Sequence, residues 1–195
     1  MSDAKTAIMD AAERRMQRGG FGGFSFREIA ADVGIKSSSV HYHFPTKEDL
    51  AAAVIRRWAQ YTSELIDKEL EKDSDPVRVW TKAFRGTAFS EAHMCPCTVL
   101  GAASRDLPDL VAKEVKGFFK MCQGKLVAEG LSPGKAAEVL STITGALVLA
   151  NALGDTAEYD RATRDLLRKS AAAPADRHGA RRPGPKRLGT VAARD

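Results

Sequence analysis

The sequence predicts an all-α protein, and three observations support this fold class. The helix-forming residues Ala, Leu, Glu, Lys and Arg abound, while aromatic residues make up 7% of the 195-residue chain. No stretch shows the sustained alternation of apolar and polar residues that is typical of a half-buried strand. Apolar residues recur instead at helical spacing along most of the chain. A chain of this length can form a small domain joined to a larger one.

The first helix is expected over residues 3–18, with Ile8, Ala11, Ala12 and Met16 on one apolar face. The glycine-rich run GGFGG at 19–23 ends this helix. The run has neither Walker spacing nor the GxGxxG pattern, and no strand precedes it. We therefore interpret it as a turn and not as a nucleotide-binding loop.

A helix-turn-helix is predicted directly after this turn. Ser25 and Glu28 have the spacing of a capping box, which indicates a helix start, and Gly34 suits the left-handed conformation that ends the helix. A second short helix is expected over 37–43, with Val40 and Phe44 facing inward as its anchors.

The second of these helices carries side chains suited to contacts with DNA. The serines at 37–39 can cap the helix and approach phosphates or base edges closely. The run His41-Tyr42-His43 is expected to point outward or sideways, and Lys47, in the first turn of the next helix, is placed to contact a phosphate. On these residues alone, a helix-turn-helix inside a purely structural three-helix bundle is the alternative.

Residues 8–50 closely resemble the N-terminal domain of TetR/AcrR-family transcriptional regulators. The matching motifs are Ile-x-x-Ala-Ala, the Gly-aromatic pair after helix one, Ile-Ala in helix two, Gly-Ile at the turn, and His-Phe-Pro-x-Lys-x-x-Leu at the end. The resemblance implies a homodimeric regulator that binds a palindromic operator in double-stranded DNA without a cofactor. Within this family the expected role is that of a repressor. It also implies a small-molecule effector that acts on the C-terminal domain. The DNA contacts that it implies fall on Ser25, Lys36, Ser37, Ser38, Ser39, His41, Tyr42 and Lys47.

The chain departs from the family pattern at a few positions. His41 stands where the family usually has Tyr, and the aromatic ring is carried by the neighbouring Tyr42. Glu13 and Arg15 occupy positions of helix one that are usually apolar, and Phe24 replaces a small polar residue. These departures concern the packing of helix one more than its function, and Phe24 is expected to fill space there.

The formal net charge of +5 suggests a polyanionic partner. Residues 171–195 contribute six basic and two acidic residues to this balance, whereas residues 1–50 carry seven of each sign. Affinity for DNA would therefore depend on where Lys36, Lys47 and the helix N-termini point. No apolar run reaches bilayer length and no signal peptide is evident, so we expect a cytoplasmic protein without membrane contact. Three cysteines in a reducing compartment indicate no disulfide framework.

The remaining helices are expected over 47–72, 76–90, 108–130, 133–153 and 155–169, with one short helix within 91–108. We divide the chain into a DNA-binding domain (1–50), a ligand-binding and dimerisation domain (51–170) and a disordered basic tail (171–195). The tail is interpreted as inert, and added nonspecific affinity for DNA is the alternative.

The helix over 133–153 is apolar almost all round, which requires burial on two sides. Small residues at Gly145 and Ala146 would let a partner helix come close. The family resemblance implies that the last two helices of each subunit form a four-helix dimer interface. Burial inside a monomer is the alternative.

The segment His93-Met94-Cys95-Pro96-Cys97 has reactive potential. A zinc site that adds the distant Cys122 is disfavoured, because Cys-x-Cys spacing is tight for one tetrahedral metal and Cys122 fits an apolar stripe; no metal is expected. Cys95 beside His93, with Arg105 or Lys82 nearby, could be partly thiolate. Some members of the resembled family sense electrophiles through a cysteine in a similar Cys-Pro-x-x-x-Leu segment, which Cys95 matches. Two ordinary half-buried cysteines are the alternative.

Aromatic side chains could converge on an apolar ligand cavity, and core packing is the alternative for each of them. The candidates are Trp58, Tyr61, Trp80, Phe84, Phe89, Phe118 and Phe119. Two other functions are alternatives. An enzyme using His93 with Cys95 or Cys97 as base and nucleophile would need an orienting group and an oxyanion site, for which the sequence has no motif. An adaptor would use the apolar helix face at 139–149 for protein contacts.

Overall fold

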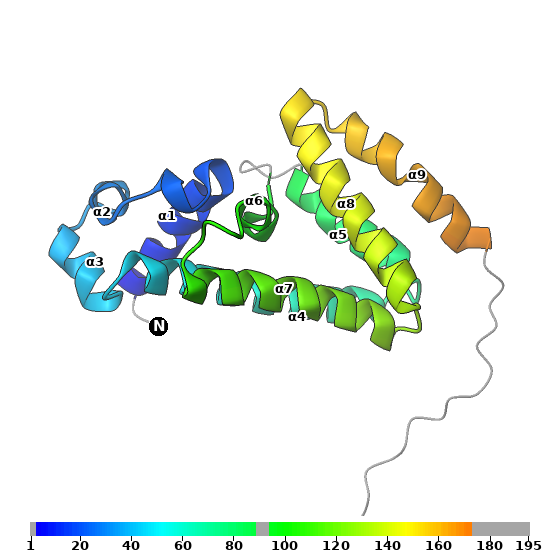
Figure 1. Ribbon diagram of the computed structural model, residues 1–195, viewed down its shortest axis with the longest axis horizontal. Coiled ribbons are helices and arrows are strands. Elements are labelled where there is room, and N and C mark those ends of the chain that lie inside the picture. Colours follow the sequence, from blue (N-terminus) through cyan, green and yellow to red (C-terminus); the bar gives the residue numbers. More distant parts are fainter. Residues whose placement is uncertain (1–2, 89–93, 173–195) are drawn as a thin grey trace, which may run out of the picture.

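The computed structural model describes residues 3–88 and 94–172, and within these ranges the chain folds into nine α-helices and one 3₁₀ turn (Figure 1). The predicted all-α class is therefore confirmed. The elements are α1 (Asp3–Gly19), η1 (Phe21–Gly23), α2 (Phe26–Val33), α3 (Ser37–His43), α4 (Lys47–Leu70), α5 (Pro76–Ala88), α6 (Pro96–Ala102), α7 (Asp109–Ala128), α8 (Pro133–Leu153) and α9 (Ala157–Ala172).

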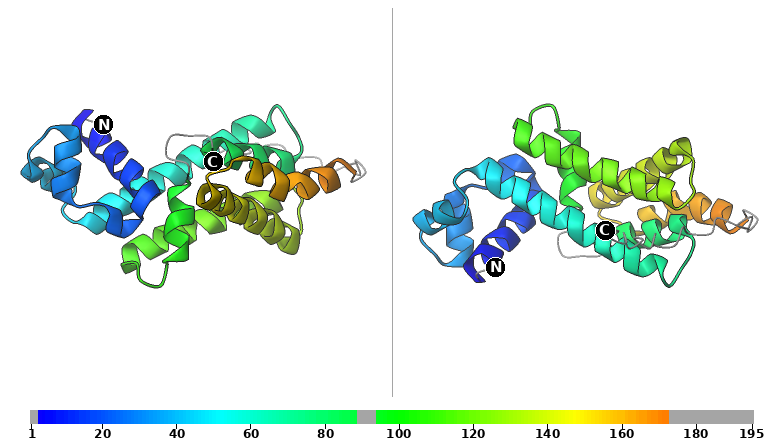
Figure 2. Two further views of the ribbon diagram at one scale, coloured as in Figure 1. Left: turned by 90° about the horizontal axis from the view of Figure 1, so that it is seen from above. Right: turned by 90° about the horizontal axis from the view of Figure 1, so that it is seen from below.

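The helices form a small head and a larger body (Figure 1). Helices α1, α2 and α3 pack on one another at one end of the molecule, and α4 leads from this head into the body, where it runs beside α7 (Figure 2). Helices α5, α8 and α9 pack together at the other end, while α6 contacts both α1 and α7. The head thus touches the body through α4 and through α6.

Local chemistry explains where the helices of the head begin and end. The Ser25 side chain accepts a hydrogen bond from the Glu28 N–H at 3.3 Å, and Gly34 ends α2 with a φ of 73°. Thr46 and Asp49 form a full capping box at the start of α4. The expected serine cap of α3 was wrong: Lys36 is the N-cap residue and no side chain caps this helix.

The helix boundaries follow the predictions closely, with one correction at the C-terminus. The Asp155 side chain accepts from the Ala157 N–H at 2.8 Å and so starts α9. Helix α9 continues to Ala172, so the first two residues of the predicted disordered tail are helical. The rest of the predicted tail, and the end of the helix predicted over 76–90, lie outside the described residues.

One continuous apolar core joins head and body. It runs from Ile8 and Met16 in α1, through Ile55 in α4, to Trp80 in α5 and Leu147 in α8, all of which are fully buried. Because this core is continuous through the described residues of both parts, a displacement of α4 or α6 in the body must repack against α1 in the head.

The unusual residues of helix one find partners at the edge of this core. Phe24 is 2% exposed and fills space as expected. Arg15 reaches across to α2, where its guanidinium donates to both carboxylate oxygens of Asp32 at 2.5 and 2.9 Å. Glu13 accepts from Arg57 of α4 at 2.7 Å. These charges therefore link α1 to its neighbours instead of entering the apolar core.

Helix α8 is long and apolar enough to cross a bilayer by length and composition, with a mean hydropathy of 1.5 over its most apolar window. The expectation that no segment would reach that length is corrected in this respect. Core helices of water-soluble proteins pass the same test, and 39% of the window is buried here against the rest of the chain. Because α8 packs on α5, α7 and α9, we interpret it as a core helix with one uncovered side.

Candidate nucleic-acid interface and effector sites

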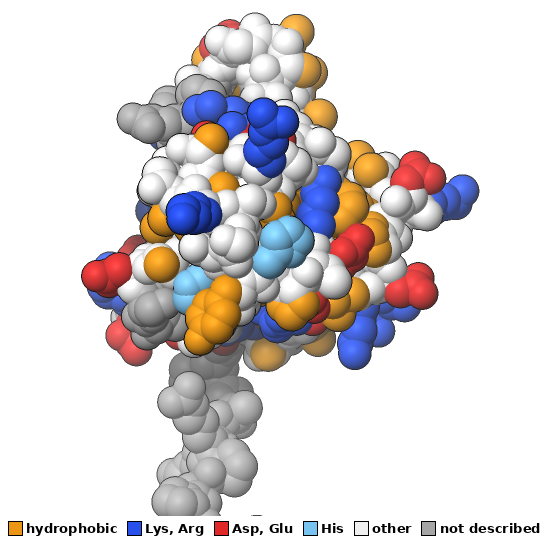
Figure 3. Space-filling view, turned by 90° about the vertical axis from the view of Figure 1, so that its left-hand side faces the viewer, with side chains coloured by type: hydrophobic (Ala, Val, Ile, Leu, Met, Phe, Trp, Pro, Cys, Tyr) orange, Lys and Arg blue, Asp and Glu red, His pale blue; other side chains and the backbone are white. Residues whose placement is uncertain are grey.

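Helix α3 separates its anchoring residues from its exposed ones. Val40 and Phe44 are 0% and 4% exposed and fix the helix to the head. Tyr42 is 85% exposed, and Ser38 and His41 are also exposed. Figure 3 views this end of the molecule, where histidine and basic side chains lie among hydrophobic side chains and uncharged surface. The face combines hydroxyl and imidazole groups, which can donate to and accept from base edges.

Ring contacts fix the direction of the exposed side chains. The His41 ring packs edge-on against Phe26 of α2, with 4.6 Å between the centroids. The Tyr42 ring makes a similar contact with His43 at 5.2 Å. The first contact places the start of α2, which Ser25 caps, next to α3. The predicted positions Ser25, His41 and Tyr42 therefore belong to one end of the head.

Lys47 lies on two aromatic rings at the start of α4. Its Nζ is 4.5 Å from the ring centroid of Phe21 and 4.7 Å from that of Phe24. Both distances are within the range of a cation–π interaction, so the ammonium group is held in place while its charge is kept. Phe24, which departs from the family pattern, thus supplies half of this platform. Lys36, the other predicted basic contact, is exposed.

The acidic residues of α2 are neutralised by Arg15. A hydrogen bond from Ser25 and the charge of Arg15 lower the pKa of Glu28, and hydrogen bonds from Arg15 lower that of Asp32. Arg27 lies on the same helix, is exposed and has no ion pair with a described residue. Sequence reasoning missed Arg27, although its position two residues after the helix cap could have indicated an exposed basic residue at this end of the head.

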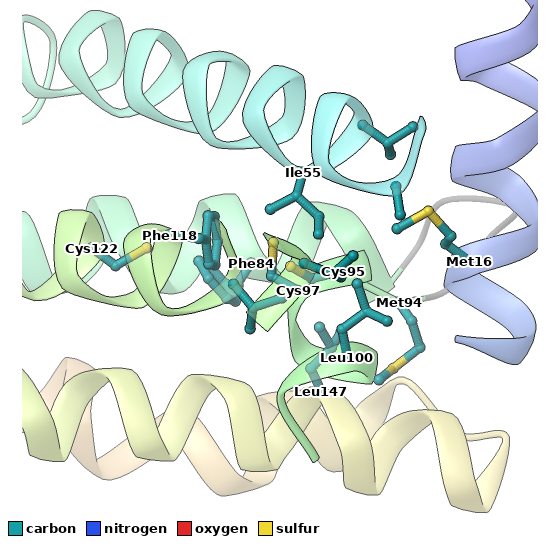
Figure 4. Packing of buried hydrophobic residues seen from close by; sticks show 14 of the residues in the cluster. Met16, Ile55, Phe84, Met94, Cys95, Cys97, Leu100, Phe118, Cys122 and Leu147 are labelled. Atoms are coloured by element: carbon teal, nitrogen blue, oxygen red, sulfur yellow. The ribbon is translucent and has the colours of Figure 1, made fainter. Parts of the chain in front are cut away.

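The three cysteines are free thiols in the core, each at most 1% exposed. Figure 4 shows Cys95 and Cys97 together in the middle of the packing, with Cys122 further along α7. Burial raises the pKa of Cys97 and Cys122. Burial also opposes ionisation of Cys95, but hydrogen bonds from the Cys97 thiol and the Thr98 N–H outweigh it and lower the pKa of Cys95.

The expected cationic neighbours do not account for this shift. The Nζ of Lys82 lies 3.8 Å from Oδ2 of Asp73. Neither Lys82 nor Arg105 is among the causes of the lowered pKa of Cys95. His93 falls outside the described residues. Within 3–88 and 94–172, no three His, Cys, Asp or Glu side chains are grouped so that they could hold a metal ion.

The candidate aromatic residues do not surround one cavity. Trp80, Phe84 and Phe118 are 0%, 4% and 1% exposed and belong to the core. Phe119 borders a hollow between α6, α7 and α8, and Phe89 lies outside the described residues. Trp58 and Tyr61 line a different hollow of about 730 Å³.

This second hollow, which we call the head–body groove, is bordered by α1, α4 and α5. Its lining residues are Glu13, Arg14, Gln17, Arg18, Arg57, Trp58, Tyr61, Leu65, Ala83, Gly86 and Thr87. Sequence reasoning found its two aromatic residues and missed the polar wall from α1.

Comparisons with known proteins agree with this geometry. Residues 8–54 match the family model described as bacterial regulatory proteins, tetR family. The HTH-type transcriptional regulator LmrA of Bacillus subtilis is 26% identical over 156 residues, which cover 75% of this chain and 82% of LmrA.

Two solved structures extend the similarity over the whole fold. A TetR-family regulator from Agrobacterium tumefaciens is 28% identical, with a TM-score of 0.79 over 85% of this chain and 96% of its own. A TetR regulator from Legionella pneumophila is 27% identical, with a TM-score of 0.77 over 87% and 98% of the two chains. The helix-turn-helix with its exposed α3 face, the matching N-terminal model and these likenesses over most of the chain lead to one conclusion: the protein is a DNA-binding transcriptional regulator of the TetR family.

Proposed function

We propose that the protein is a cytoplasmic, homodimeric repressor that binds a palindromic operator and is released by a small molecule or electrophile acting on its C-terminal domain. The observation that carries this proposal is the outer face of α3, where Tyr42 is 85% exposed beside the exposed Ser38 and His41. Regulators of this family are not enzymes, so the catalytic alternative for His93 and the cysteines is set aside.

The proposed contacts divide by chemistry. Ser38, His41 and Tyr42 would meet base edges in the major groove, because α3 is narrow enough to enter it and carries donors and acceptors there. Lys36 and Lys47 would meet phosphates, which position the protein without reading sequence. Arg27 joins this second group as a contact proposed from its exposure.

Dimerisation is supported by an apolar stripe on the uncovered side of α8. Val148, Leu149 and Leu153 are 47%, 43% and 60% exposed. Gly145 lies on the same side with open space next to its Cα, so a second helix could approach closely there. A symmetric pair of chains would cover the stripe and present two α3 helices to successive major grooves, about 34–36 Å apart.

Titration with DNA tests the main proposal. Palindromic duplexes selected from a random library would be titrated at two salt concentrations, with a scrambled duplex of equal length as the control. We expect two subunits per duplex, a clear preference for the selected sequence, and affinity that falls steeply as salt rises. Equal affinity for both duplexes, or one subunit per duplex at saturation, would contradict the proposal.

Cys95 is the proposed site of an electrophile response, because its pKa is lowered while those of Cys97 and Cys122 are raised. With a quinone, the thiolate sulfur would add to a ring carbon while an electron pair moves to the conjugated carbonyl oxygen, which takes the proton released by the thiol. The hydrogen on the attacked carbon would then move as a proton to the other carbonyl oxygen, which completes a hydroquinone thioether. Cys95 is 1% exposed, so the adduct requires α6 to move, and α6 packs on α1 of the head.

The Cys95→Ser variant tests this response, with Cys122→Ser as the matched control. We expect benzoquinone to release operator DNA from the wild type and from Cys122→Ser, and to leave Cys95→Ser bound. Release from Cys95→Ser at the wild-type rate would eliminate Cys95 as the sensor.

A further inference from the structure

We propose that the head–body groove binds a planar aromatic carboxylate, and that this ligand is the effector that controls operator binding. The regulatory part of this inference rests on the proposed repressor function. The binding part rests on three observations of the groove itself: an accessible aromatic wall, two exposed arginines that form no ion pair with a described residue, and an accessible amide between them.

The aromatic wall is formed by neighbouring residues of α4. The Trp58 and Tyr61 rings lie with their centroids 6.0 Å apart and their planes at 48°. Tyr61 is 56% exposed, although the other large aromatic residues of the body that the structure describes are mostly buried. Leu65 and Ala83 extend the apolar lining. The volume of about 730 Å³ is within the range of small-molecule sites, so two or three fused rings can be accommodated.

The opposite wall carries an excess of positive charge. Arg57 is held by Asp10 and Glu13, each at 2.7 Å, so its charge is compensated. Arg14 and Arg18 border the same groove, are exposed, and form no ion pair with any described carboxylate. Two exposed guanidinium groups that border the same groove as a pair of rings favour a ligand with an anionic end and a flat apolar body. A carboxylate fits the planar guanidinium fork.

Gln17 is the third observation. It lines the groove between Arg14 and Arg18, and its side-chain amide makes no hydrogen bond to a described residue. The residue is 7% exposed, and its amide atoms are not among the fully buried ones, because the buried side-chain atoms without a partner in the described chain are Trp80 Nε1 and Thr98 Oγ1. An accessible amide at the wall of a hollow can exchange its water for a polar group of a ligand. Its NH₂ could donate to the same carboxylate that the arginines attract.

The position of the groove makes it suited to regulation. One wall is α1, which packs on α2 and α3, and the other walls are α4 and α5 of the body. The Arg57 ion pairs join these walls at the groove, linking α4 to α1. A guest between the walls favours whichever spacing of α1 and α4 it fits best, so it can change the direction in which α3 is held.

Isothermal titration calorimetry of the full chain with 2-naphthoate tests the binding. We expect saturable binding, and at least about tenfold weaker binding of the neutral analogue 2-naphthalenemethanol, because the charge-assisted hydrogen bonds are lost. The double variant Arg14→Gln with Arg18→Gln should bind both compounds equally weakly. Arg105→Gln, which removes an exposed arginine outside the groove, should bind naphthoate as the wild type does.

Operator affinity measured on the same preparations separates the possible failures. The inference is supported if naphthoate lowers the operator affinity of the wild type and leaves the operator affinity of the double variant unchanged. Operator binding without naphthoate binding, or naphthoate binding that the double variant keeps, would overturn the inference while the repressor function stands. Naphthoate binding that leaves operator affinity unchanged would overturn the regulatory part. Absence of operator binding by the ligand-free wild type would instead contradict the repressor function.

Discussion

Residues two positions apart in α3 have opposite environments, so a side chain proposed to contact DNA can be removed without disturbing the residues that fold the head. Val40 is fully buried, whereas Tyr42, two positions later, has 85% of its surface exposed. The Tyr42 ring touches the neighbouring His43 and is not part of the core cluster. Removing this side chain should therefore change what the head binds and leave the head folded.

We predict that Tyr42→Ala lowers operator affinity about 10- to 100-fold, as expected when one base-edge contact is lost from each subunit. Its free energy of unfolding in urea should match that of the wild type. The control is Val127→Ala, which removes an exposed apolar side chain from α7, outside the head and the head–body groove. Equal losses of affinity in both variants, measured by fluorescence anisotropy with labelled operator, would argue against a direct role of Tyr42.

Individual residues also show where sequence reasoning reached its limit. The place of Lys47 in the first turn of a helix could be predicted from the sequence, and its contact with a phosphate remains a prediction. Its aromatic platform could not be predicted, because Phe21 and Phe24 lie in an irregular segment without helical period. Trp58 and Trp80 were equally plausible as ligand contacts in the sequence. Only the packing of neighbouring helices places one at a groove and the other in the core.

Among the elements, α1 is held to α2 and to α4 by bridging ion pairs. Arg15 connects it to Glu28 and Asp32 of α2, and Arg57 of α4 connects to Asp10 and Glu13. Helical period and capping residues predicted the bounds of nearly every helix, because those signals are local. The angles between helices, and hence the groove, depend on such contacts between residues far apart in the chain, which no local pattern reveals.

The link between α1 and α2 should give the protein a specific response to acid. The pKa of Glu28 is below its ordinary value of 4.5, through Ser25 first and then Arg15, and that of Asp32 is below 3.8 through Arg15. Lowered carboxyl pKa values in the folded state stabilise the protein above the pKa of the unfolded chain. This contribution is lost as pH falls through the lower, folded values.

We therefore predict that Arg15→Gln is less stable than the wild type near neutral pH, and that the difference narrows as pH falls below 4.5. Urea unfolding followed by circular dichroism at a series of pH values would measure the narrowing. Arg105→Gln, at an exposed residue without an ion pair to the described part of the chain, is the control and should track the wild type throughout. A difference that stays constant across the acid range would show that Arg15 acts through packing and not through these carboxylates.

In the whole molecule, the proposed DNA contacts lie in the head at one end, and α8 with its apolar stripe belongs to the body (Figure 1). Helices α4 and α7 run side by side between them, and helices of this kind move as rigid bodies. Pairing through α8 would therefore fix the separation of two heads from a distance. The groove between α1 and α4 lies on this path, so a guest there could change the separation without touching the dimer interface.

The α8 stripe gives the sharpest test of this arrangement. We predict that Leu149→Glu converts the proposed dimer to a monomer. The Leu149 side chain is 43% exposed in the single chain, and a carboxylate at this position would have to be buried between the two α8 helices of the dimer. Sedimentation velocity would measure the subunit state. The matched control is Val127→Glu on α7, where the apolar side chain is 40% exposed but lies outside the stripe, and this variant should stay dimeric.

The same two variants connect assembly to DNA binding. In a dimer, binding of one head to the operator makes binding of the second head effectively intramolecular, and a monomer lacks this second contact. The operator affinity of Leu149→Glu should therefore fall by about 10²-fold or more. Val127→Glu should bind the operator as the wild type does. Leu149 contributes little to the core of one chain, so we expect the circular dichroism spectrum of Leu149→Glu to remain that of a helical protein. The comparison of DNA binding is valid only if it does. A wild type that sediments as a monomer on and off the operator, or a dimeric Leu149→Glu, would show that the two heads are not joined through α8.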